Sequence, residues 1–328
     1  MCHTHVLYSL LSLHTLPREP TRYVLAESPL RMELLGVVRR DAMLVKDNII
    51  LGDINEAVSE LLHYKMAGGK SLVDCALPGT GRDPVGLAKI SRATGINIIC
   101  SSGWYIAPTH PPYVRSSSID ELCARIVREL TVSIGATGIR AGAIKVALSG
   151  TPNEPFSNEE EKTLRAAARA QAKTGAPLNI HPNYAGKHWH TYLEILEEEG
   201  ANLRKCCLNH MEMYLPDIDY QKSLLQRGVF VSYDQFGHEQ YMDSIAPGWG
   251  FKPDSARVEG LLELLRAGHA HNIMLANEVA FKCCYKKYGG YGYSHVLENI
   301  APELRFKGVK QEQIDTMLIE NPKEFLSY

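Results

Sequence analysis

The segment Ala143-Ile144-Lys145-Val146-Ala147 decides how this sequence is interpreted. Apart from its central lysine it is a short apolar run, and such runs are typical of strands that are covered on both faces, as in a parallel sheet. An ammonium group in such a strand would be costly to remove from water. The segment therefore predicts a buried parallel strand that carries a lysine into the interior of the fold.

Seven other apolar runs of similar length are spread along the chain, and amphipathic helix-like segments separate them. Strands that alternate with helices predict stacked βα units and a parallel sheet. Eight such units in 328 residues predict one α/β domain over residues 1–328, a (β/α)8 TIM barrel. Besides Ala143–Ala147, the expected strands are Cys2–Val6, Ser71–Leu77, Ile96–Ser101, Pro177–His181, Cys206–His210, Val229–Tyr233 and Ile273–Ala276.

Three expected helix starts have the spacing of a capping box, in which an N-cap residue is followed three positions later by a glutamate. They are Asp53 with Glu56, Ser118 with Glu121, and Ser157 with Glu160. Two longer stretches, Leu16–Asp53 and Gln235–Asp254, have no clear pattern and are expected to be irregular. Because they follow the first and seventh strands, we expect both to overhang the face where the barrel strands end.

The charges of the chain exclude two classes of partner. The 35 basic and 37 acidic residues give a formal net charge of -2, so no broad positive field attracts nucleic acid or an anionic membrane. We therefore expect a small-molecule substrate. Eight scattered cysteines without C-x-x-C spacing are typical of reduced thiols in a cytoplasmic enzyme and not of a disulfide framework.

Histidines lie at the ends of several expected strands. His3 and His5 share one side of the first strand, because side chains alternate along a strand, and could bind one metal ion together. His181 and His210 end the fifth and sixth strands. The carboxyl ends of parallel barrel strands open on one face, so these imidazoles and Lys145 would converge there. Imidazole and carboxylate ligands favour Zn2+ or a similar divalent ion.

Lys145 and Glu278 are the expected reactive groups. Burial lowers the pKa of a lysine and frees its amine, which could form a Schiff base or take up carbon dioxide as a carbamate that bridges two cations. A lysine that snorkels out of the barrel end is the structural alternative. Glu278 follows the last strand, where it could bind a metal and act as general base toward a water. Pairing of Glu278 with Lys282 is the alternative.

Several motifs occur together in this chain: Gly138–Ala147, His3-Thr4-His5, Ile180-His181, Asn209-His210, Lys286–Tyr293 and Glu320-Asn321-Pro322. With these motifs the chain resembles the phosphotriesterase family of the amidohydrolase superfamily over nearly its whole length. The resemblance implies a (β/α)8 barrel with a binuclear metal centre at the C-terminal face of the strands, bridged by a carboxylated lysine and a hydroxide.

The resemblance also implies the ligand of each ion. By matching position, His3, His5 and Glu278 would hold the more buried ion, His181 and His210 the more exposed ion, and carboxylated Lys145 both. The expected metal is Zn2+, with Mn2+ and Co2+ as alternatives.

The chain departs from the family pattern at several positions. Family members usually have aspartate where this chain has Glu278 and Glu212, and glutamate where it has Thr4. A longer side chain at Glu278 moves the carboxylate relative to a metal, so we expect reduced or redirected activity. Relatives also have a longer segment before the His-x-His motif, so we expect a short first strand and a short or missing N-terminal cap of the barrel.

Loops after the expected strands supply candidates for substrate binding. These candidates are Trp104, Tyr105, His110, Lys187, Tyr241 and Lys282, and Phe236 and Trp249 add aromatic surface after the seventh strand. The rings could bind an apolar or sugar-like ring, and a lysine could bind a phosphate on a phosphorylated sugar lactone. Core packing and solvated surface positions are the alternatives for these residues.

The first functional hypothesis is a metal-dependent hydrolase of lactones or other carboxylic esters. The alternatives are a phosphotriester hydrolase, a metal-binding relative that has lost turnover, and an aldolase that uses Lys145 as a Schiff-base amine. The metal-type residues argue against the aldolase, which has no use for them. A homodimer formed through the aromatic loops is a further alternative to the monomer.

Overall fold

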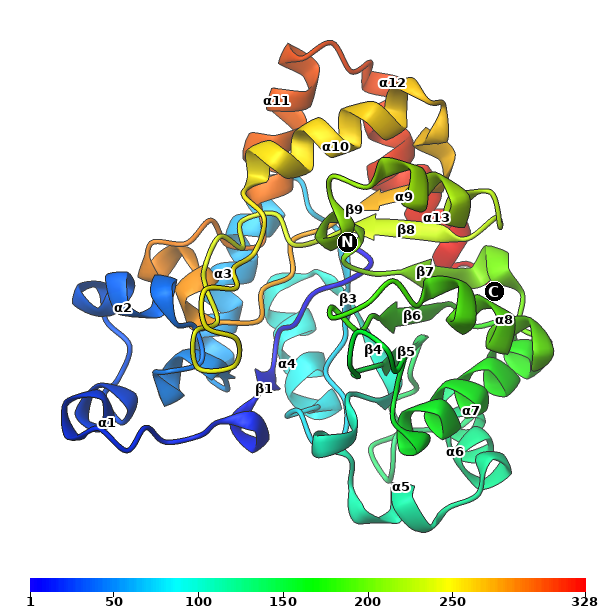
Figure 1. Ribbon diagram of the computed structural model, residues 1–328, viewed down its shortest axis with the longest axis horizontal. Helices are drawn as coiled ribbons and strands as arrows, with labels where there is room; N and C mark the ends of the chain where they lie inside the picture. The colour runs from blue at the N-terminus through cyan, green and yellow to red at the C-terminus, as the bar shows by residue number, and fades with distance from the viewer.

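A parallel sheet of seven strands, β3 to β9, forms the centre of the molecule. The computed structural model describes all 328 residues, and these strands pair with their neighbours in chain order. All six pairs are parallel, so the seven strands end on the same side of the sheet (Figure 1). The strands are β3 Ser71–Asp74, β4 Asn97–Trp104, β5 Ala143–Ala147, β6 Leu178–His181, β7 Cys206–Leu208, β8 Phe230–Tyr233 and β9 Ile273–Leu275.

The N-terminal segment occupies the place of the eighth strand. The amide of Thr4 donates to Val73 O (3.2 Å), and its carbonyl accepts from the amide of Cys75 (2.9 Å), which makes a parallel bridge to β3. On the other side, the amide of Val279 donates to Thr4 Oγ1 (3.2 Å) and not to a backbone carbonyl. The expected strand Cys2–Val6 is thus reduced to one bridge, and the segment completes a (β/α)8 barrel between β9 and β3.

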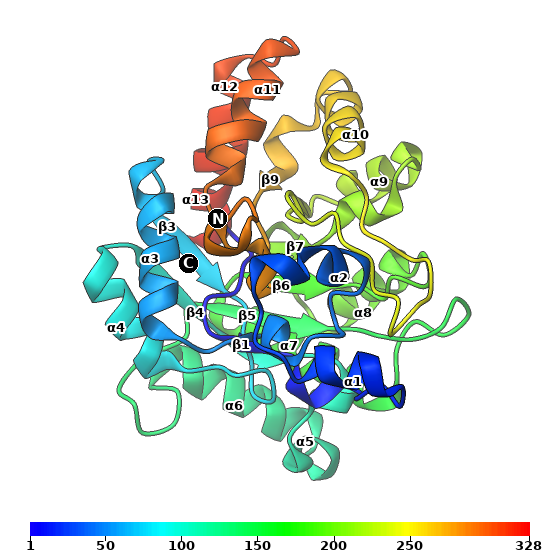
Figure 2. The ribbon, with the colours of Figure 1, turned by 90° about the vertical axis from the view of Figure 1, so that its left-hand side faces the viewer.

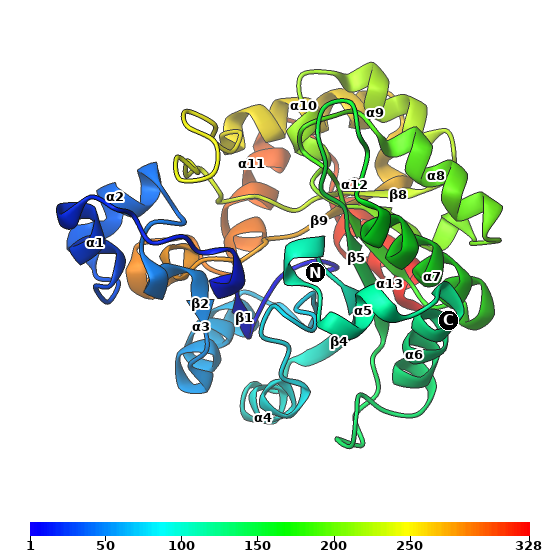
Figure 3. The same cartoon turned by 60° about the horizontal axis from the view of Figure 1, so that its bottom comes forward.

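Helices cover the outside of the sheet between successive strands (Figures 1 and 3). They are α3 Ile54–Met66, α4 Pro84–Thr94, α5 Pro112–Ser116, α6 Ile119–Thr131, α7 Asn158–Thr174, α8 Trp189–Glu198, α9 Ile218–Leu225, α10 Asp254–Arg266, α11 Ala301–Phe306, α12 Gln311–Asp315 and α13 Asn321–Leu326. The expected alternation of strand and helix is confirmed.

Two of the three expected capping boxes are present, at the starts of α6 and α7. At the start of α3, Asp53 accepts hydrogen bonds from amides of the first turn. The carboxylate of Glu56, however, accepts from the ammonium of Lys287 (2.7 Å) and not from the N-cap amide. The box predicted there is wrong because Glu56 has a charged partner from a distant segment.

Strand β4 is longer than expected and runs to Trp104. Gly103 permits this extension, since its φ is +134° and a Cβ at this position would lie 1.9 Å from Lys145 O. Only glycine tolerates both the conformation and the close approach. The glycine therefore keeps β4 paired with β5, the strand that carries Lys145.

The stretch Leu16–Asp53 is not irregular, and that prediction is wrong. It forms α1 (Pro20–Ala26) and α2 (Leu35–Arg40), and its strand β2 (Ile50–Leu51) pairs antiparallel with β1 (Tyr8–Ser9), which precedes the stretch. Helices of two turns are too short to show a clear 3.6-residue pattern. A small apolar core stabilises them and consists of Leu30, Leu34, Val38 and Val45.

The stretch Gln235–Asp254 contains no helix or strand before its last residue, Asp254, which begins α10, and it lies against α2 (Figure 2). Arg40 Nε lies 2.6 Å from Asp243 Oδ2, and Ser244 donates to the Asp41 carboxylate through both its amide and its hydroxyl. We call the two stretches Leu16–Asp53 and Gln235–Asp254 together the cap. Its helices α1 and α2 lie at one end of the molecule, away from α6, α7 and α8 (Figures 1 and 3).

One large apolar core joins the sheet to its covering helices. All eight cysteines are free thiols, and seven of them are buried, which agrees with the expected reduced state. No helix of the structure is both long enough and apolar enough to span a bilayer.

Glu160 connects the loops that follow β4 and β5. Its buried carboxylate accepts from the amide of Ala107 (2.9 Å), from the amide and hydroxyl of Ser149 (3.2 and 2.6 Å), and from the amide of Ser157 (3.0 Å). These four bonds anchor two loops at the face where the strands end.

Glu160→Ala should lower the free energy of unfolding by about 2–4 kcal/mol, because it leaves buried amides without an acceptor. Denaturant unfolding followed by circular dichroism measures this change. Glu161→Ala is the matched control, since Glu161 forms only a partly exposed pair with Arg165 and should change stability by about 0.5 kcal/mol at most. Equal stabilities of the two variants would contradict the anchoring role.

Candidate active site

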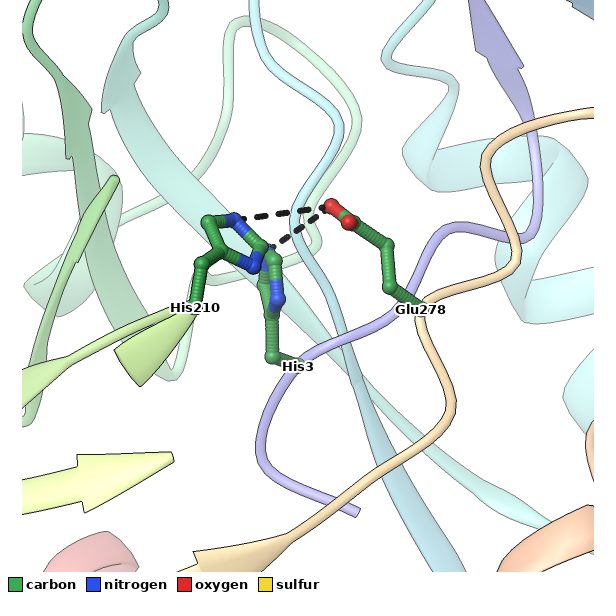
Figure 4. A group of neighbouring side chains, drawn as sticks. All are labelled: His3, His210 and Glu278. Atoms are coloured by element: carbon green, nitrogen blue, oxygen red, sulfur yellow. Dashed lines mark ion pairs between the residues drawn. The ribbon is translucent and has the colours of Figure 1, made fainter. Parts of the chain in front are cut away.

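Side chains from five strand ends meet in the mouth of the barrel. His3 comes from the N-terminal segment, Lys145 from β5, His181 from the end of β6, His210 from the residues after β7, and Glu278 from those after β9. All five are buried. Ligand atoms of His3, His210 and Glu278 lie within 4.8 Å of one another (Figure 4). The parallel topology thus brings together residues that are far apart in the sequence.

One carboxylate oxygen of Glu278 faces three imidazoles. Its Oε1 lies 3.7 Å from His3 Nε2, 3.4 Å from His5 Nε2 and 3.7 Å from His210 Nε2. Burial raises the pKa of a carboxyl group, but the neighbouring histidines outweigh it and hold the pKa of Glu278 well below its ordinary value. Glu278 is therefore an ionised acceptor at the centre of the cluster.

Asp234, which directly follows β8, binds two of these histidines at once. Its Oδ2 accepts from His3 Nδ1 (3.0 Å) and its Oδ1 from His210 Nδ1 (2.6 Å). Each Nδ1 therefore carries the proton, and each Nε2 is left unprotonated, with Lys145 Nζ 3.2 Å from His3 Nε2 and His181 Nδ1 3.0 Å from His210 Nε2. Burial opposes ionisation of Asp234, but His210 and His3 outweigh it, so the pKa of Asp234 lies well below its ordinary value.

Sequence reasoning missed Asp234, although a signal was present. It is a carboxylate that comes immediately after the expected strand Val229–Tyr233. His210 and Glu278 likewise lie at or just past the ends of their expected strands.

Burial lowers the pKa of His210, but the charges of Asp234 and Glu278 outweigh this effect and raise the pKa of His210 above its ordinary value.

Glu212 lies beneath Asp234 and not in the histidine cluster. Its Oε1 accepts from the backbone amides of Asp234 (3.0 Å) and Gln235 (2.6 Å). Burial, with the charge of Asp234 adding to it, raises the pKa of Glu212 to about 8. Glu212, at a position where the family resemblance led us to expect aspartate, therefore supports the backbone that carries Asp234.

Lys145 points into the cluster and does not snorkel out of the barrel. Its Nζ donates to Asn209 Oδ1 (2.6 Å) and lies 3.2 Å from His3 Nε2. Asn209 is held in turn by Asn179 Oδ1 (3.1 Å). Burial lowers the pKa of Lys145, which favours the neutral amine, and a neutral amine is the nucleophile that can add to carbon dioxide.

The remaining histidines complete a set of donors that fits divalent cations. His181 Nδ1 lies 3.0 Å from His210 Nε2, and His5 Nδ1 is buried without a hydrogen-bond partner. Burial lowers the pKa of His3 to about 3 and that of His181 well below its ordinary value, so both are neutral. Neutral imidazoles beside an ionised carboxylate are the ligands that zinc-like ions require.

Most expected substrate-binding residues make other contacts. Trp104 is 1% exposed and donates to Tyr113 OH (3.1 Å), and His110 Nε2 bonds to Tyr105 O (2.7 Å). The ammonium of Lys187 pairs with Asp217 and that of Lys282 with Asp47, so Lys282 does not pair with Glu278. Tyr241 lies on the cap under the guanidinium of Arg40 (4.4 Å).

Aromatic rings nonetheless flank the cluster. Tyr105 lies 5.2 Å from the ring of His181, and Tyr184 lies 5.0 Å from it on the loop after β6. Tyr8 stacks on His5 with ring centroids 3.7 Å apart. Of these three, sequence reasoning named Tyr105 alone, because Tyr8 and Tyr184 lie three residues beyond a histidine in segments without a distinct pattern.

Asp234→Asn should lower metal affinity about 10–100-fold, since a carboxamide oxygen can accept from one imidazole while its amino group repels the other. Titration of metal-depleted protein with Zn2+ by calorimetry measures the effect. Asp219→Asn changes an exposed carboxylate on α9 and should bind as the wild type does. Equal affinity of the two variants would show that the histidines do not depend on Asp234.

Comparisons with known proteins identify the family. The model of the phosphotriesterase family matches residues 17–326. A phosphotriesterase-related protein from Nematostella vectensis is 33% identical over 100% of this chain and 94% of its own length, and the N-acetyltaurine hydrolase of Homo sapiens is 31% identical over 95% and 89%. The crystal structure of a resiniferatoxin-binding protein from Rhodobacter sphaeroides is 34% identical, covers 100% of this chain and 90% of that one, and superposes with a TM-score of 0.94. The chain belongs to the phosphotriesterase family and is a hydrolase.

Proposed function

We propose that this protein hydrolyses a carboxylic acyl bond, an amide or an ester, of a small molecule with the help of two divalent cations. The observation that carries the proposal is the cluster itself: His3, His210 and Glu278 present ligand atoms within 4.8 Å, with both imidazoles oriented by Asp234. Buried charged groups arranged in this way are costly for folding and are typical of a catalytic centre.

The family resemblance implies the ligands of each ion. His3, His5 and Glu278 would hold one ion, His181 and His210 the other, and Lys145, carboxylated at Nζ, both. Zn2+ suits these nitrogen and oxygen donors, and Mn2+ and Co2+ are the alternatives. Two such ions would lower the pKa of a water molecule and polarise the acyl oxygen of the substrate.

A residue of the chain, Glu278, would accept the proton of the attacking water and return it to the leaving atom. Glu278 is ionised, and its Oε1 lies within 3.7 Å of three imidazole nitrogens, so it can accept the proton of the attacking water and return it to the leaving atom. Asp234 keeps His3 and His210 in the tautomer that leaves Nε2 free. Glu212 holds Asp234 in place through the backbone.

The first substrate to test is N-acetyltaurine, because N-acetyltaurine hydrolases are about a third identical to this chain over most of their length. Lactones and simple carboxylic esters are the second candidates. The rings of Tyr105 and Tyr184 beside His181 favour a substrate with an apolar portion.

Metal removal and reconstitution test the proposal. Protein stripped by a chelator should lose activity, and Zn2+, Mn2+ or Co2+ should restore hydrolysis of N-acetyltaurine, lactones or esters at about two ions per chain. Faster turnover of aryl phosphotriesters would favour the phosphotriesterase alternative. Full metal loading without turnover of any of these compounds would reject the proposal.

Lys145→Ala should abolish activity and lower metal content, because it removes the group that would bridge both ions. Partial rescue by acetate or propionate is expected, since a free carboxylate can occupy the space of the lost carbamate. Lys89→Ala, which removes an exposed lysine of α4, serves as the control. Full activity in Lys145→Ala would remove this lysine from the mechanism.

A further inference from the structure

Tyr184 lies between the histidine cluster and the cap. Its ring centroid is 5.0 Å from that of His181 and 5.8 Å from that of His210. On its other side it stacks on Trp249 of the cap, with centroids 5.9 Å apart and planes inclined by 24°. The ring is therefore held by contacts on both sides, which fixes the position of its hydroxyl.

Gln235 orients that hydroxyl. Its Nε2 donates to Tyr184 Oη (3.0 Å), and its backbone amide is bound by Glu212 (2.6 Å). Gln235 is fully buried, whereas Tyr184 is half-buried. Tyr184 Oη accepts this bond and makes no other hydrogen bond to the protein, so its own O–H remains available as a donor.

The orientation of the Gln235 carboxamide follows from the accounting of its polar atoms. In the structure Nε2 donates one of its two N–H groups to Tyr184, and Oε1 and the second N–H have no partner. The reversed amide would direct the oxygen toward Tyr184 and leave both N–H groups of Nε2 buried without an acceptor. A buried N–H without a partner is rarer than an under-satisfied carbonyl oxygen, so Nε2 faces Tyr184.

We propose that Tyr184 is a catalytic residue that donates a hydrogen bond to the acyl oxygen of the substrate as this oxygen becomes an anion, and that Gln235 is its positioning residue. This inference rests on the proposed acyl hydrolysis. Tyr184 contacts His181 and His210, the two ligands expected at the more exposed ion, and an acyl oxygen that enters from the cap side arrives beside both of them.

The step balances without an additional reactant. The oxygen of water bonds to the acyl carbon, the π electrons of the carbonyl move to the acyl oxygen, and the proton of water passes to Glu278. When the carbonyl re-forms, the bond to the leaving nitrogen or oxygen breaks and Glu278 returns the proton to that atom. Tyr184 keeps its proton throughout and supplies only a hydrogen bond.

The phenol of Tyr184 suits this role. A phenol with an ordinary pKa of about 10 is protonated at neutral pH and can act as a hydrogen-bond donor. A fixed neutral donor gains most when its acceptor becomes charged, and it therefore stabilises the transition state more than the bound substrate.

Tyr184→Phe tests the proposal, because it removes one oxygen and keeps the ring. We expect kcat for acyl substrates to fall about 10²-fold while KM changes about twofold or less. Metal content should equal that of the wild type. Binding of a methylphosphonate monoester, a stable tetrahedral analogue, should weaken by a similar factor in calorimetry, whereas binding of acetate should stay within about twofold.

Two further variants separate chemistry from loop structure. Tyr214→Phe removes a hydroxyl that contacts Asn183 O (3.4 Å) and Gly186 O (3.5 Å) of the same loop but does not face the cluster. It should leave kcat and phosphonate binding unchanged. Gln235→Leu should lower kcat less than Tyr184→Phe, and the double variant should lose no more than Tyr184→Phe alone, since Gln235 acts through Tyr184.

Equal kcat and equal phosphonate binding in the wild type and Tyr184→Phe would overturn the inference, as would a matching loss in Tyr214→Phe. These results are distinct from failure of the proposed function, which would appear in the wild type itself as an absence of acyl hydrolysis after metal loading.

Discussion

The bridge that Asp234 makes between His3 and His210 is the interaction on which the rest of the site depends. The two histidines reach the mouth of the barrel from elements that are not neighbours in the sheet, and one carboxylate fixes the tautomer of both. An imidazole that keeps its proton on Nδ1 has an unprotonated Nε2, and this is the atom through which it can bind a cation. The charge of Asp234 would be costly in this dry setting without the two Nδ1 donors, so the carboxylate and the imidazoles stabilise one another.

Glu212 and Glu278, which stand where the family resemblance led us to expect aspartate, act at different depths of the same mouth. Glu212 reaches past the cluster to the amides of Asp234 and Gln235, and its length matches that distance. Glu278 extends over the cluster from the opposite rim and places one oxygen near three imidazoles. The same change of residue type therefore supports the backbone in one case and faces the reacting groups in the other.

Much of the fold followed from the sequence because parallel barrel strands have a distinctive composition. A lysine inside Ala143–Ala147, histidines at three other strand ends and Glu278 after a fifth are unusual enough to place five strand ends at one face. Asp234 was missed because an acidic residue at the start of a long loop looks like ordinary loop composition. The ion pairs of Lys187 with Asp217 and of Lys282 with Asp47 could not be predicted, because sequence does not reveal which distant carboxylate a lysine will meet. The helices α1 and α2 escaped detection because two turns contain too few apolar positions to define a period.

The single bridge made by Thr4 has a consequence for how the ring of strands is closed. Between β9 and residues 2–5 there is no ladder of backbone hydrogen bonds, and this seam is joined by side chains: Thr4 to the amide of Val279, His3 and His5 to Glu278, and Tyr293 to the carbonyl of His5. The same few side chains therefore close the barrel and form the reactive centre. The local opening that needs the least free energy in a barrel closed in this way is separation of residues 2–5 from β9. This opening disrupts the reactive centre before any other part of the sheet.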